Sequence, residues 1–127
     1  MHWRSRWPSR VRIVDCSAEA GYADAKFESR AFTVTPLVED AGFVAVLRLG
    51  PGGRIGRHPA TGQQVFAVID GQGLVSGNDG VEQPIHAGEA AVWQQGEEHE
   101  TRTDDGLTAV VSEGPDVVLL LPLTAGQ

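Results

Sequence analysis

The chain has 127 residues, 41% hydrophobic and 21% charged, which suits one globular domain and is too short for two. Its net charge is −7 although four arginines lie within residues 1–12, and so acidic a body excludes nucleic acid as a partner. No apolar run reaches the ~20 residues that span a bilayer, so we expect no membrane contact. Cys16 is the only cysteine, which rules out an internal disulfide and predicts a cytoplasmic protein.

Residues 1–12 are expected to be a basic arm, and residues 13–127 a single domain. Across the chain, 16 glycines and 7 prolines separate short runs rich in valine, isoleucine and leucine. The one helical candidate is Ser17–Ala25, with Ser17 as its cap. Strands are predicted at Val11–Asp15, Ser29–Val34, Gly42–Leu49, Gly56–Pro59, Gln64–Asp70, Gly73–Ser76, Val81–His86, Ala90–Gln94, His99–Thr103, Leu107–Glu113 and Val117–Leu121. So many short strands predict an all-β fold, an antiparallel sandwich or barrel.

Two features of these strands go beyond their length. Gly73–Ser76 and Val81–His86 are joined by Gly-Asn-Asp-Gly at residues 77–80, whose residue types tolerate the positive φ of tight turns, so we expect a hairpin. The segment Phe43–Leu49 is apolar on both alternating faces. One face is expected to line the interior, and the other to lie against a second layer or another subunit.

Two histidines are candidates for a site inside such a barrel. Alternate residues of a strand face the same way, so His58 shares a face with Ala60 and, if the strand is regular, with Arg54. By the same rule His99 shares a face with Glu97. If both histidines face inward, they meet near the centre, where small barrels form ligand and metal sites.

The spacing around these histidines resembles the two motifs of the cupins. The first motif is Gly-x5-His-x-His, three or four residues, Glu-x6-Gly, and its positions here are Gly52, His58, Ala60, Gln64 and Gly71. The second is Gly-x5-Pro-x-Gly-x2-His-x3-Asn, and its positions are Gly88, Gln94, Gly96, His99 and Thr103. Every spacing is kept. The resemblance implies a cupin barrel, which is an antiparallel double-stranded β-helix or jelly roll.

The resemblance also implies a metal site, in altered form. Metal-binding cupins use both histidines and the glutamate of the first motif and the histidine of the second. Here Ala60 and Gln64 replace two of those four ligands, so His58, Gln64 and His99 remain to hold a divalent Zn, Ni, Cu or Fe. Glu97 is a candidate for the missing carboxylate. Alternatively the pocket holds no metal, and the histidines bond to each other, to Gln64 and to water. No nucleotide or organic cofactor is expected.

Other pocket candidates follow from the same comparison. Trp93 is expected to face the interior, Phe66 and Val68 share the face of Gln64, and Ala60 leaves space for a ligand. Arg54 either reaches an anionic ligand or is solvated.

Three functions stay open for this pocket. One is a metal-dependent enzyme of oxygenase, isomerase, lyase or cyclase type, with Glu97 or metal-bound water as base. The second is a non-catalytic protein that binds or senses a small ligand, and the third is metal-free acid–base catalysis by His58 and His99. Because cupins commonly pair through outer sheet faces, we also predict a homodimer.

Overall fold

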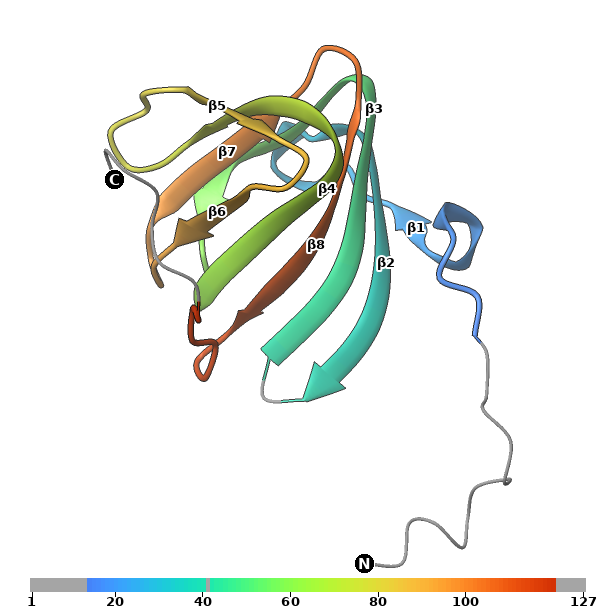
Figure 1. Ribbon diagram of the computed structural model, residues 1–127, viewed down its shortest axis with the longest axis horizontal. Helices are drawn as coiled ribbons and strands as arrows, with labels where there is room; N and C mark the ends of the chain where they lie inside the picture. Colours follow the sequence, from blue (N-terminus) through green and yellow to red (C-terminus); the bar gives the residue numbers. More distant parts are fainter. Residues whose placement is uncertain (1–13, 41, 121–127) are drawn as a thin grey trace, which may run out of the picture.

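Eight strands and two short 3-10 turns account for the regular structure of the residues that the computed structural model describes, 14–40 and 42–120 (Figure 1). The turns are η2 (Ala18–Ala20) and η3 (Lys26–Glu28). The strands are β1 (Tyr22–Ala23), β2 (Arg30–Asp40), β3 (Gly42–Pro59), β4 (Gln63–Ser76), β5 (Gln83–His86), β6 (Ala90–Trp93), β7 (Glu98–Arg102) and β8 (Leu107–Gly114). The predicted all-β class is confirmed.

The two long strands, β3 and β4, close the sheet into a barrel (Figure 1). The first half of β3 pairs with β2 and β8, and its second half pairs with β7. The first half of β4 pairs with β8 and β6, and its second half with β7 and β5. All these pairs are antiparallel, and β3 and β4 each contribute to both layers. This is the double-stranded β-helix expected from the cupin motifs.

The core lies between the two layers, where alternate side chains of each strand point inward. In β4 the residues Gln64, Phe66 and Val68 are buried, and those between them are partly exposed. The apolar core consists of Phe32, Val34, Ala45, Leu47, Leu49, Ile55, Ala60, Phe66, Val68, Ile85, Trp93, Leu107, Ala109 and Val111.

The predicted hairpin is confirmed, with Val75 opposite Gln83 as the last pair before the turn. Two pairs of predicted strands prove to be single long strands, β3 and β4. The chain bends without breaking the strand because Gly71 takes a φ of 81°, which side chains disfavour, and because β-bulges interrupt the register.

Two predicted elements are wrong, the helix and the last strand, and most of a third, the strand Val11–Asp15, lies outside the described residues. Ser17–Ala25 is not a helix: it contains the three-residue turn η2 and the short strand β1, and the Ser17 side chain makes no capping bond. Residues 117–120 and 14–15 form no strand, and residues 11–13 and 121 lie outside the described part, as does the basic arm. Within the described ranges we find no helix of the length and apolarity that crossing a membrane requires.

The outer face of β3 is partly covered by the chain itself. Val46 lies outside the core cluster, yet it is only 7% exposed. Its neighbour in the register, Thr35, donates through Oγ1 to the Ser17 carbonyl at 3.0 Å, and Arg48 donates to the Cys16 carbonyl at 3.1 Å. The N-terminal segment therefore supplies part of the second layer expected over Phe43–Leu49.

Candidate functional site

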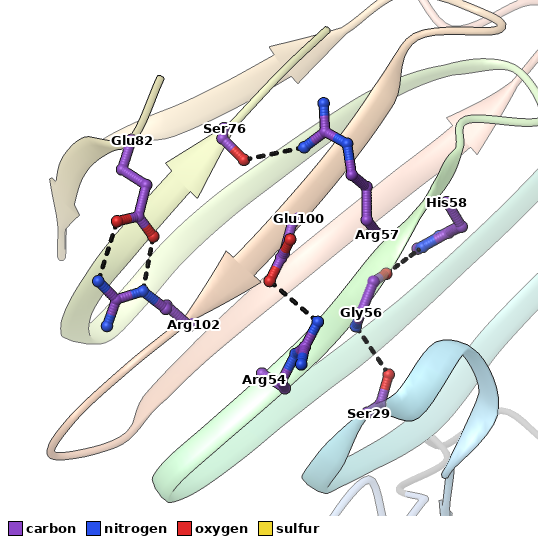
Figure 2. Close-up of polar contacts among 9 residues, drawn as sticks. All are labelled: Ser29, Arg54, Gly56, Arg57, His58, Ser76, Glu82, Glu100 and Arg102. Carbon is purple, nitrogen blue, oxygen red and sulfur yellow. Dashed lines mark hydrogen bonds and ion pairs between the residues drawn. The ribbon is translucent and has the colours of Figure 1, made fainter. Parts of the chain in front are cut away.

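The second half of β3 lies beside β7, and this pairing brings the two histidines together. His58 and His99 are opposite each other in the register, and their ring centroids are 4.3 Å apart with the planes tilted by 52°. A β-bulge precedes His58, because two residues lie between Ile55 and His58 while only one lies between their partners on β7. The bulge residue Arg57 is exposed and donates to Ser76 Oγ at 3.3 Å (Figure 2).

Both imidazoles are held in the same tautomer by backbone carbonyls. His58 Nδ1 lies 2.7 Å from the Gly56 oxygen (Figure 2), and His99 Nδ1 lies 3.2 Å from the Glu97 oxygen. A carbonyl oxygen only accepts, so Nδ1 must carry the hydrogen in each ring. In the neutral form, the lone pair of each ring is therefore on Nε2, free to accept a hydrogen bond, a proton or a metal ion.

His99 is a weak base in this setting. Only 3% of the residue is exposed, and burial lowers the pKa of its imidazole below the ordinary 6.5. A positive charge on the neighbouring His58 lowers that pKa further, while the bond to Glu97 opposes the shift. At neutral pH His99 is therefore uncharged.

Aromatic rings flank the histidine pair on both sides. Trp93 packs on His99 with centroids 4.6 Å apart, donates through Nε1 to the Ser76 carbonyl at 3.2 Å, and meets the edge of Phe66 at 6.0 Å. On the other side Phe27, from η3, stacks on His58 at 4.2 Å with planes 5° from parallel. Phe27 was missed from the sequence because it is a single aromatic residue between predicted elements, without a periodicity to place it.

The other interior candidates lie where alternation puts them. Gln64 is 6% exposed and pairs in the register with Trp93, and Ala60 is 2% exposed and pairs through its backbone with Glu97 and Gly96. Val68 is buried but lies further along β4, opposite Ala109, away from the histidines.

Arg54 does not face the histidines, which corrects the assumption of a regular strand. The bulge between Ile55 and His58 shifts the alternation by one residue, so Arg54 shares the outer face with Glu100. The two side chains form an ion pair at 3.2 Å (Figure 2). Arg54 is thus neither fully solvated nor directed at a ligand in the barrel.

Glu97 contributes its backbone to the site. Its carbonyl accepts from His99 and Ala60, while its carboxylate accepts from the Gln94 amide at 3.0 Å. In the described ranges no group of three His, Cys, Asp or Glu side chains is arranged to hold a metal ion. The carboxylate expected to complete the metal site is therefore not in such a group with the histidines.

A cavity of about 570 Å³ opens beside the site, at the edge strands β5 and β6. Trp93 and Glu97 line it together with apolar side chains such as Val75, Ile85 and Ala91. Trp93 thus has a place both in the wall of this cavity and in the row of rings that contains His99 and His58.

Comparison with known proteins points to one fold. The family model described as "Cupin domain" matches residues 45–113, more than half of the chain. A solved structure from Thermotoga maritima, described as a predicted oxalate decarboxylase, has a TM-score of 0.67 at 18% identity over 78% of this chain and 96% of its own. An uncharacterized Klebsiella pneumoniae protein with a double-stranded β-helix domain has a TM-score of 0.62 at 22% identity, and the match covers 84% of this chain and 91% of the Klebsiella chain. The cupin domain of Schizosaccharomyces pombe Cnp3 has a TM-score of 0.63 at 12% identity, and the match covers 76% of this chain and 74% of the Cnp3 chain. No curated protein matches.

Proposed function

This chain belongs to the cupin family, and from that premise we propose that it binds a small molecule inside its barrel, against His58 and His99. The observation that carries the proposal is the shared tautomer of the two rings. Each Nδ1 is occupied by a backbone carbonyl, so in the neutral form each ring keeps its lone pair on Nε2, and the two ring centroids lie 4.3 Å apart. A ligand that supplies hydrogen-bond donors can therefore bond to both rings.

The acceptor pair selects a chemical class. Neutral imidazoles present lone pairs at Nε2, so the ligand must present a hydroxyl or an N–H group. The depressed pKa of His99 keeps that ring uncharged at neutral pH, ready to accept a proton as well as a hydrogen bond. A ligand with an acidic O–H can thus share its proton with His99 Nε2 or lose it to that atom, while His58 holds the ligand in place. This makes acid–base catalysis the reaction type that the site supports.

A divalent ion is a second candidate ligand, favoured by the same hydrogen bonds. Metal-binding histidines usually donate their other ring nitrogen to a carbonyl or carboxylate, as both rings do here. His58, His99 and the Gln64 amide fit Zn, Ni, Cu or Fe in donor type, although no carboxylate among them balances the charge. Such an ion would supply Lewis acidity. The missing carboxylate predicts weak, exchangeable binding.

The test is a titration of the two imidazoles, followed by ¹⁵N NMR of labelled protein. The probes are four donor-bearing molecules, acetamide, ethylene glycol, phenol and benzamide, and separately Zn²⁺. We expect saturable shifts of the Nε2 resonances of both histidines, and His99→Ala to weaken binding about tenfold, the value of one hydrogen bond. His86→Ala is the matched control, because His86 is exposed and pairs with Glu89 on the surface.

Two results would contradict the proposal. If neither the organic probes nor Zn²⁺ shifts the two histidines, the interior is not a binding site. If His99→Ala binds every probe as the wild type does, the site lies elsewhere. Shifts with Zn²⁺ alone would favour the second candidate over the first.

A further inference from the structure

The ring of Phe27 lies on the binding site and is itself open to solvent. It stacks nearly parallel on His58, with planes 5° apart and centroids 4.2 Å apart, and the residue is 52% exposed. One face of the ring therefore covers the imidazole, while much of the side chain remains in water. We call this ring the cover, because it stacks on an imidazole of the proposed site without being buried in the core.

The backbone that carries Phe27 is strained. Phe27 and Glu28 have φ values of 59°, and Ala31 follows with a φ of 49°. Residues with a Cβ rarely adopt this left-handed region, because their side chains are strained there. Such outliers cluster at ligand clamps and switch segments, where surrounding contacts maintain them. Three of them within five residues, directly over a candidate site, mark this segment as held in place rather than relaxed.

The contact that holds it is with the strand that carries His58. A Cβ on Gly56 would overlap the carbonyl oxygen of Phe27, so only glycine admits the segment at this position. The Gly56 amide donates to Ser29 Oγ at 3.0 Å, and Ser29 is buried (Figure 2). The segment is thus anchored at Ser29, two residues beyond the ring. The Phe27 side chain takes no part in that anchor.

We propose that Phe27 occupies the place of a flat ring of the ligand, so that the ligand of this barrel is aromatic or heteroaromatic and displaces Phe27 from His58. This inference rests on the proposed function, to which it adds the ligand class. The face that Phe27 covers is planar and matched to a ring, and stacking of a ligand ring there replaces the contact that Phe27 gives up. Trp93, buried on the far side of the pair, stays as the fixed wall.

The experiment compares one flat probe with its saturated counterpart. Benzamide and cyclohexanecarboxamide carry the same amide donor, and their affinities are measured by the His58 and His99 imidazole resonances. Phe27→Ala removes the competing ring, so benzamide is expected to bind about tenfold more tightly than to the wild type, the value of about one aromatic stack. Cyclohexanecarboxamide must displace Phe27 as well, so its affinity should also rise, but it should bind Phe27→Ala about tenfold more weakly than benzamide does because it cannot stack. Phe27→Tyr is the matched control, because it keeps the ring and should keep the wild-type affinities.

A second variant loosens the segment without removing its ring. Ser29→Ala removes the acceptor of the Gly56 amide, leaves the Gly56 carbonyl on His58 in place, and is expected to raise benzamide affinity in the same direction. Equal benzamide affinities in the wild type and Phe27→Ala would overturn the cover while leaving the proposed function intact. Equal affinities of the two probes for Phe27→Ala would overturn the aromatic ligand class. Failure of all the donor-bearing probes in every variant would instead reject the binding site itself.

Discussion

The carbonyl two residues before each histidine determines what that ring can do. Gly56 and Glu97 occupy this position relative to His58 and His99, and each accepts from Nδ1. The two rings therefore reach the site from different strands in the same chemical form. The cupin motifs specify the histidines by spacing, but they do not specify the carbonyls, which are present in every residue and are selected only by the local backbone. The tautomer is thus a property of the fold.

His99 should make the stability of the protein depend on pH. Its pKa is lower in the folded protein than the 6.5 of the unfolded chain, because of burial and then of the charge of His58 on β3, with Glu97 and Glu113 acting in the opposite direction. Between these two pKa values the unfolded chain binds more protons, so the free energy of unfolding falls as pH falls below about 6.5. We expect the urea midpoint to decrease from pH 7.5 to pH 5, and His99→Gln to reduce that decrease. The control His86→Gln should show the same decrease in urea midpoint as the wild type. If His99→Gln also shows the wild-type decrease, His99 is not the source of the pH dependence.

At the scale of elements, the bend of β4 depends on Gly71. Its φ is 81°, and a Cβ there would lie 2.8 Å from Leu107 Cα and closer still to the Gly106 carbonyl. Gly71→Ala should therefore combine backbone strain with overlap and lower the free energy of unfolding by about 3 kcal/mol. Gly80→Ala is the matched control, because Gly80 has a φ of 72° but open space around it. Gly80→Ala should lower the free energy of unfolding by about 1 kcal/mol, because only the backbone strain applies at this position. Equal losses, measured by urea unfolding, would show that the contact with Gly106 is unimportant.

Elements with a period or a turn signature were predictable from the sequence, and irregularities were not. Alternation placed Phe66 and Gln64 in the interior, and Gly-Asn-Asp-Gly marked the hairpin, because each follows from local residue types. The bulge before His58 has no such signature, and one extra residue moved Arg54 to the outer face beside Glu100. Phe27 reaches the site through left-handed backbone that its own residue types disfavour. Both departures depend on contacts between segments distant in sequence, which spacing does not record.

At the scale of the molecule, the barrel joins its two histidines by pairing rather than by proximity in the chain. β3 contacts β2 and β8 in one layer and β7 in the other, so a single strand carries core residues such as Leu47 and also His58 of the candidate site. The N-terminal segment contacts this arrangement at two places, through the Cys16 and Ser17 carbonyls beside β3 and through Phe27 on His58.

Exposed apolar side chains on the surface of the barrel predict that the protein is a dimer. The N-terminal segment covers β3 at Val46, but Leu37 and Val38 on β2 remain 44% and 56% exposed beyond the part of β2 that β1 pairs. Neighbouring exposed apolar side chains on a sheet edge favour association with a second copy. We expect light scattering to return twice the 13.5 kDa of the chain, and Leu37→Asp with Val38→Lys to return the monomer. Val81→Lys, at an exposed position in the hairpin turn, is the control that should stay dimeric. A wild-type mass of 13.5 kDa at micromolar concentration would rule out this dimer, and an unchanged mass in the double variant would place the interface elsewhere.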